Sequence, residues 1–181
     1  MKKLLLATSL LINILAFSQP KQLTSEQLRR ADSIVKSNIN FESIELELIS
    51  LINAYRLTLK LDTLVYDTNV QKAAKFQIDY NISINKLTHS NINLLSDVSA
   101  RVEKFTKIHP TTSGEVLAST SPLWVVSENR TIAESILEMW KSSPSHNTIL
   151  TFPKMKSIGV SVNRKDKKSG AIFAGAVLVV L

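Results

Sequence analysis

The chain carries an export signal but no cysteine, and this combination is the strongest limit on how it can fold. Lys2 and Lys3 precede a largely apolar run from Leu4 to Phe17, and Ala16-Phe17-Ser18 places small residues where a signal peptidase reads. The run is about 14 residues long, too short for the roughly 20 residues of a membrane-spanning helix. We therefore predict a signal peptide over residues 1–18 and a secreted or periplasmic protein, with no transmembrane anchor after cleavage.

The absence of cysteine excludes both a disulfide framework and a lipid-modified bacterial N-terminus. Small secreted domains of animals and plants usually carry disulfides, so this chain is typical of a bacterial protein that is stabilised by core packing alone. The formal net charge is +7, and the one dense basic cluster, residues 164–168, lies between two apolar runs and ends in Ser169-Gly170. This setting favours a turn between strands over a patch for anionic partners.

Hydrophobic periodicity predicts an α+β domain from Phe41 onward, preceded by a polar N-terminal arm over residues 19–41. In the arm, Leu28, Ala31, Ile34 and Val35 would share one face of a short helix. Helices are expected from 41 to 55, from 67 or 68 to 78, over 98–105, and from 127 to a stop at Ser143-Pro144. Strands are expected at 114–118, 157–162 and 171–181, the last with both faces covered, and a polar loop over 81–93.

Two of the three histidines lie in similar short polar stretches at expected helix ends, namely His89 and His146. Such segments often carry binding groups, and imidazole is both a common metal ligand and a proton carrier near neutral pH. Glu115 follows a glycine at the start of an apolar strand, where its carboxylate needs a partner. The residues alone leave two interpretations open, a shared site of these three side chains or histidines that are merely structural. His109, before Pro110, is interpreted as a loop residue.

Several familiar active-site motifs are absent from the sequence. There is no His-Glu-x-x-His, no Gly-x-Ser-x-Gly elbow and no glycine-rich phosphate loop. We expect no bound organic cofactor and no nucleic acid partner.

Short segments along the chain together resemble the CAP superfamily, also called the SCP domain, in its cysteine-free bacterial branch. This family includes cysteine-rich secretory proteins, insect venom antigens and plant pathogenesis-related proteins. The resemblance covers about residues 43–181, which it implies to be the domain, with residues 19–42 as the N-terminal arm. It rests on a first helix ending in Asn53-x-x-Arg56, on Leu64-Val65-Tyr66-Asp67 followed by Ala73-Ala74, on Thr88-His89-Ser90, on Gly114-Glu115-Val116, on the stretch from Met139 through Trp140 to Leu150, and on Ser157 to Val162.

The resemblance implies a three-layer α-β-α sandwich with a small, mainly antiparallel central sheet. It also implies a cleft in which His89, Glu115 and His146 hold a divalent cation such as zinc, weakly bound. Three departures from the family pattern concern this cleft. Val116 replaces an asparagine, Ser145 and Asn147 replace a glycine and an arginine, and the second acid of the animal proteins falls near Ser143 and is missing. Glu138 lies nearby in sequence but is not assigned as a ligand.

Three functions follow as hypotheses. The first is a non-enzymatic binding module for an envelope or extracellular ligand, with lipid and polysaccharide as candidates. The second is a metal-dependent hydrolase, protease-like or nuclease-like, with Glu115 as general base. The third is a structural or adhesive envelope protein with a vestigial cleft, in which the basic turn contacts anionic polymers.

Overall fold

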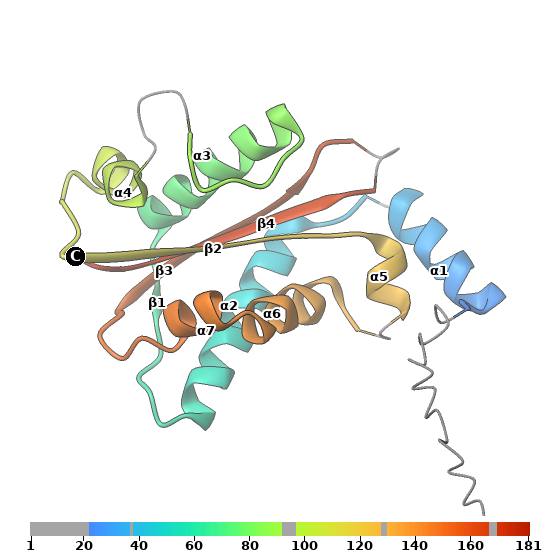
Figure 1. Cartoon of the computed structure of the whole chain (residues 1–181), viewed down its shortest axis with the longest axis horizontal. Helices are drawn as coiled ribbons and strands as arrows, with labels where there is room; N and C mark the ends of the chain where they lie inside the picture. The colour runs from blue at the N-terminus through green and yellow to red at the C-terminus, as the bar shows by residue number, and fades with distance from the viewer. Residues whose placement is uncertain (1–21, 37, 92–96, 128–129, 167–169) are drawn as a thin grey trace, which may run out of the picture.

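The computed structural model describes residues 22–36, 38–91, 97–127, 130–166 and 170–181, so the predicted signal peptide lies outside the described residues. In the described part, a four-stranded sheet is sandwiched between helices (Figure 1). Helices α3 (Thr68–Ile84) and α4 (Val98–Thr106) cover one face. Helices α2 (Phe41–Thr58), α6 (Ile132–Ser142) and α7 (Pro144–Leu150) cover the other. The predicted three-layer α+β sandwich is confirmed.

The sheet has the strand order β1-β3-β4-β2. The long strands β2 (Thr112–Thr120), β3 (Ser157–Arg164) and β4 (Ile172–Val180) pair antiparallel, whereas the two-residue β1 (Val65–Tyr66) pairs parallel with β3. Strand β4 lies in the middle and is buried from Ile172 to Val179, as its unbroken apolar sequence predicts. Strand β2 forms one edge of the sheet, and the candidate site lies along this edge.

Side chains alternate between the two faces of the sheet and build a core on each side. Toward α2 and α6, the core contains Leu48, Ile52, Ile136 and Trp140 packed on Val116, Ala118, Val160 and Leu178. Toward α3 and α4, smaller clusters form around Val70, Ala74 and Val102 on Val177 and Val179, and around Ile78 on Leu117 and Phe173. The helix that follows Asp67 is capped by the Asp67 carboxylate, which accepts from the backbone N–H groups of Asn69 and Val70.

Helix α3 approaches β3 so closely that only glycine fits at position 159. A Cβ there would lie 2.1 Å from the Gln71 nitrogen and 2.3 Å from the Val70 carbonyl carbon. Both atoms are backbone, so neither can move without shifting the helix. The glycine of the Ile-Gly-Val strand thus sets the distance between α3 and the sheet.

Three expectations about helices and loops are wrong, each for a local reason. Helix α3 continues to Ile84, where Asn85 adopts a left-handed conformation (φ 53°) and ends it, so the polar stretch from Asn81 is partly helical. The Trp140 helix starts at Ile132, because Thr131 and Glu134 form a capping box. The Trp140 helix ends at Ser142, as expected, but the polar stretch after it, which contains His146, is not a loop: Pro144 opens α7, because proline fits the first helical turn.

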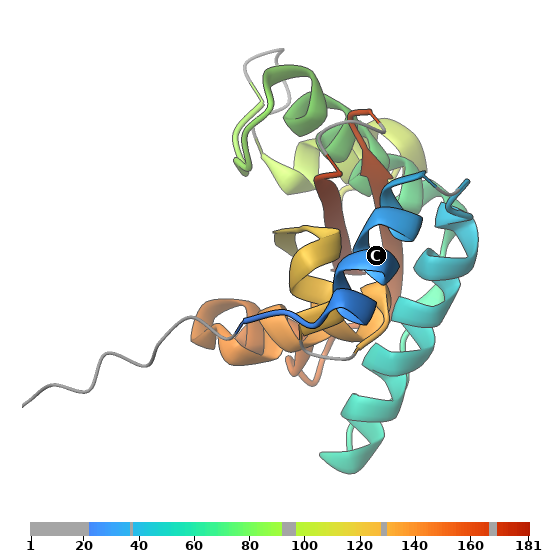
Figure 2. The same ribbon diagram turned by 90° about the vertical axis from the view of Figure 1, so that its right-hand side faces the viewer.

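The N-terminal arm contains the expected helix, α1 (Ser25–Lys36), which packs against the short helix α5 (Pro122–Ser127) at one end of the sandwich (Figure 2). Gln27 donates to the carbonyl of Val126, and Arg164 donates to the carbonyl of Val35. Ala31 is buried, whereas Leu28 is half exposed, so the apolar face of α1 is only partly covered. None of the helices within the described ranges is long and apolar enough to cross a membrane.

Candidate functional site

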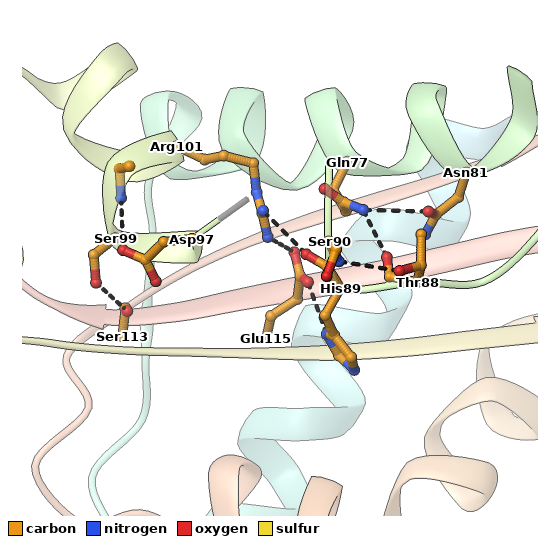
Figure 3. Close-up of polar contacts among 11 residues, drawn as sticks. Gln77, Asn81, Thr88, His89, Ser90, Asp97, Ser99, Arg101, Ser113 and Glu115 are labelled. Atoms are coloured by element: carbon orange, nitrogen blue, oxygen red, sulfur yellow. Dashed lines mark hydrogen bonds and ion pairs between the residues drawn. The ribbon is translucent and has the colours of Figure 1, made fainter. Parts of the chain in front are cut away.

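Glu115, Arg101 and His89 form a closed network beside the edge strand β2 (Figure 3). The Glu115 side chain is only 4% exposed, and its two oxygens have different partners. Oε1 accepts from Nη2 of Arg101 at 2.5 Å, and Oε2 lies 2.9 Å from Nδ1 of His89. The buried carboxylate therefore has the partners that its position requires, a cation on one side and an imidazole on the other.

The loop that carries His89 is held by its backbone from two helices. Gln77 of α3, fully buried, donates from Nε2 to the carbonyl oxygen of Thr88 at 2.6 Å, and Arg101 of α4 donates to the carbonyl oxygen of His89 at 3.3 Å. Gln77 also donates to Oδ1 of Asn81 at 3.2 Å, so the buried amide oxygen of Asn81 has a partner within α3. The His89 imidazole itself stays 58% exposed, so the loop is fixed while its ring faces solvent.

His146 approaches His89 from the opposite layer of the sandwich. It lies on α7, and the centroids of the two imidazole rings are 6.3 Å apart with an interplanar angle of 54°. Burial, and secondarily the neighbouring His89, lower the pKa of His146 from its ordinary value near 6.5. His146 is therefore mostly neutral at neutral pH, which is the form that binds metal ions.

Arg56, fully buried at the end of α2, anchors the C-terminal end of α7. Its Nη1 donates to the carbonyl oxygens of Leu150 at 2.7 Å and Phe152 at 3.2 Å, and its Nε donates to that of Asp62 at 2.8 Å. In the middle of α7, Asn147 accepts from the hydroxyl of Tyr55, also on α2, at 2.9 Å. The position of His146 thus depends on contacts between α2 and α7.

The donor set around His89 and His146 fits a divalent cation only through its two imidazoles. Within the described part of the chain, no three His, Cys, Asp or Glu side chains are grouped to hold a metal ion. Nδ1 of His89 is engaged by Glu115, which leaves Nε2 as the nitrogen for a ligand, an arrangement common among metal-binding histidines. Two imidazoles on one tetrahedral zinc ion would have centroids roughly 5 Å apart, so these rings would need to close by about 1 Å.

Comparisons with known proteins identify the family. The model of the cysteine-rich secretory protein family, CAP, matches residues 49–180. The chain belongs to the CAP family. A comparison with curated protein sequences finds no match.

Three solved structures show the same fold as this CAP protein. An outer surface protein from Borrelia burgdorferi superposes with a TM-score of 0.64 at 21% identity, covering 78% of this chain and 96% of that one. An SCP-domain extracellular protein from Bacillus anthracis superposes with a TM-score of 0.65 at 17% identity, covering 88% of this chain and 45% of that one. A cysteine-rich secretory protein from Staphylococcus aureus superposes with a TM-score of 0.60 at 12% identity, covering 80% of this chain and 40% of that one. The chain spans less than half the length of the last two.

The three residues predicted as a shared site lie near one edge of the sheet, but they do not all contact one another. His89 and Glu115 are in contact, and the ring of His146 lies near that of His89 without touching Glu115 in any contact seen among the described residues. His109 lies apart in an exposed pair with Glu103, at 2.7 Å, as the loop interpretation expects. Sequence reasoning missed Arg101, whose only signal was an arginine inside a short helix after the His89 loop. It noted Arg56 only as part of a motif, without its role.

Proposed function

We propose that this CAP protein acts outside the cytoplasm as a non-enzymatic binding module. Its cleft holds a divalent cation between His89 and His146 and presents the cation to an envelope or extracellular ligand. The contact between Glu115 and Nδ1 of His89 carries this proposal, because it orients the ring and leaves Nε2 for a cation. Two proteins of similar fold, an outer surface protein from Borrelia burgdorferi and an extracellular protein from Bacillus anthracis, support this location.

Two imidazole ligands leave open coordination positions on a cation, which a ligand or water can fill. A site with so few protein ligands binds weakly, since structural zinc sites usually have four. The cation would supply Lewis acidity, and the protein's own residues would position it. His146 contributes a neutral imidazole, and His89 contributes an imidazole that is held by Glu115 and Arg101.

The surroundings of Glu115 support binding over hydrolysis. A general base must accept a proton from a water molecule or substrate within hydrogen-bond reach. Here one carboxylate oxygen accepts from Arg101 and the other contacts His89, in a side chain that is 4% exposed. Both oxygens of Glu115 are thus engaged by protein groups, whereas a general base needs an oxygen that a water molecule or substrate can reach.

Calorimetry with zinc on the mature protein, from residue 19 onward, tests the proposal. The wild type should bind one zinc ion, and the His89→Ala, His146→Ala double variant should not. His109→Ala is the matched control, since it removes a histidine outside the cleft and should bind like the wild type. Equal binding by wild type and double variant would contradict the cation site. Chelator-sensitive hydrolysis of casein, DNA or lipid esters that is lost with the double variant would contradict the non-enzymatic role.

A further inference from the structure

Another groove lies at the end of the sandwich where α5 connects β2 to α6 (Figure 1). It consists of two adjoining cavities of about 570 and 400 Å³, which share Trp124 of α5 and Met139 of α6 as lining residues. Both volumes lie in the range of roughly 300–1,000 Å³ that is typical of small-molecule sites. Among the described residues, His89, Glu115 and His146 line neither cavity, so this Trp124 groove is separate from the histidine cleft.

The wall of the Trp124 groove combines an exposed aromatic ring with many hydroxyl groups. Trp124 is 49% exposed, so much of its ring surface is available for contact, and Met139 adds a flexible apolar side chain. The other lining residues include five that carry hydroxyls, namely Ser119, Thr120, Ser121, Ser135 and Ser142. An acyl chain would leave these hydroxyl groups without partners, so the lining favours a polar ligand that also has a flat apolar face.

Two of these hydroxyl groups have no hydrogen-bond partner although their residues are buried. Thr120 is 6% exposed and Ser135 is 0% exposed, and neither Oγ1 of Thr120 nor Oγ of Ser135 is bonded within the described part of the chain. A buried polar group without a partner is unfavourable, so each hydroxyl would gain from a ligand that supplies one. Because both residues line the groove, rotation about the Cα–Cβ bond can turn each hydroxyl toward a ligand without moving the backbone.

Arg130 adds a positive charge that its surroundings leave uncompensated. It lines the smaller cavity beside Glu138, but the Glu138 carboxylate accepts from Nζ of Lys141 at 3.2 Å. The Arg130 guanidinium makes no hydrogen bond or ion pair with the residues that the structure describes. Guanidinium groups bind carboxylates through two parallel hydrogen bonds, so this charge favours a ligand that carries carboxylates.

We infer that the Trp124 groove binds an acidic polysaccharide, a chain of pyranose rings that bear carboxylates. Trp124 packs against the apolar face of one ring, the hydroxyl residues bond the sugar hydroxyls, and Arg130 pairs with a carboxylate. Ser135, Met139 and Ser142 follow one face of α6 over about 10 Å, which suits an extended chain. This inference rests on the proposed role as a binding module but not on the cation, which would lie in a different cleft.

Tryptophan fluorescence of the mature protein with tetragalacturonate, a chain of four carboxylated pyranose rings, tests the inference. The protein has two tryptophans, and Trp140 is fully buried, so a change on binding reports on Trp124. The change should saturate, and maltotetraose, a neutral chain of the same length, should bind about tenfold more weakly or less. Tetraglutamate, which has the carboxylates without the rings, should not compete. Equal affinity for both saccharides, competition by tetraglutamate, or no saturable binding would overturn the inference.

Two variants test the assigned residues by calorimetry. Trp124→Ala and Arg130→Gln should each weaken tetragalacturonate binding by about tenfold or more, and circular dichroism should show that both fold, because neither side chain is buried. Lys165→Gln is the matched control, since it removes an exposed positive charge outside the groove and should bind like the wild type. Equal weakening in Lys165→Gln and Arg130→Gln would overturn the inference, because it would indicate a general attraction to the net positive charge.

The cation site and the Trp124 groove can fail separately. The His89→Ala, His146→Ala double variant should keep the wild-type affinity for tetragalacturonate, and a loss there would contradict a groove that is separate from the cleft. Saccharide binding by a protein that does not bind zinc would refute the cation site alone. Zinc binding without saccharide binding would refute this inference alone.

Discussion

Replacing Arg56 by methionine should destabilise the protein severely, because one buried side chain connects three segments. Arg56 donates to the carbonyl oxygens of Asp62, Leu150 and Phe152 at 2.7 to 3.2 Å. Methionine keeps most of the packing of the aliphatic stem, so the lost hydrogen bonds dominate. At the lower end of about 1.5–3 kcal/mol for each bond to a charged group, the free energy of unfolding should fall by about 4–5 kcal/mol.

Urea denaturation followed by circular dichroism measures this loss. With a denaturant slope of about 2 kcal/mol per molar, the midpoint should fall by roughly 2 M. Arg29→Met is the matched control, because Arg29 is exposed on α1, and it should change stability by less than about 0.5 kcal/mol. A loss below about 1 kcal/mol for Arg56→Met would refute the assigned role of Arg56.

Three further predictions concern other parts of the molecule. Because the pKa of folded His146 is lowered, the unfolded chain binds more protons just below the ordinary value near 6.5, so stability should decrease as the pH falls through that window. Urea unfolding at about pH 7.5 and about pH 5 should show a smaller loss for His146→Gln than for the wild type, and an equal loss would contradict the burial of His146. Gly159→Ala should lower the melting temperature far more than Gly114→Ala, because the new Cβ meets helix backbone at 2.1 Å in the first case and a side-chain methyl, Cγ2 of Ile149, at 2.7 Å in the second. Similar melting temperatures would contradict the close approach of α3 to β3. Arg164→Met should make α1 more accessible to limited proteolysis, because the hydrogen bond from Arg164 to the carbonyl of Val35 is lost. Lys165→Met, at the neighbouring exposed position, should leave cleavage unchanged, and equal cleavage of the two variants would contradict the anchoring of α1 by Arg164.

The architecture of the protein was largely predictable from its sequence, because the core elements have clear periodicity. The apolar faces of α2 and α3 and the unbroken apolar strand β4 are local patterns that predict both element type and burial. Element boundaries were less predictable because capping decides them. Thr131 and Glu134 form a capping box that the sequence displays, yet the preceding Ser127-Glu128-Asn129 resembles a helix start equally well.

The candidate site was only partly predictable, because its polar contacts join residues far apart in the chain. The sequence indicated that Glu115 needs a partner but not which one, since the contact with Arg101 arises only when α4 packs beside β2. Likewise, the polar stretch with His146 was expected to be a loop after the helix stop, whereas Pro144 opens α7 there and the imidazole of His146 lies near that of His89. Sequence patterns indicate burial well, but they do not specify which buried groups meet.

The most direct test of the cation cleft is a zinc titration followed by two-bond ¹H–¹⁵N NMR of the histidine rings. The protein has three histidines, and His109, paired with Glu103 outside the cleft, serves as an internal control. We expect Nε2 of His89 and a nitrogen of His146 to shift together and to saturate at one zinc ion per chain, while His109 stays unchanged. Unshifted cleft histidines, or a shift of only one of them, would contradict a cation shared between His89 and His146.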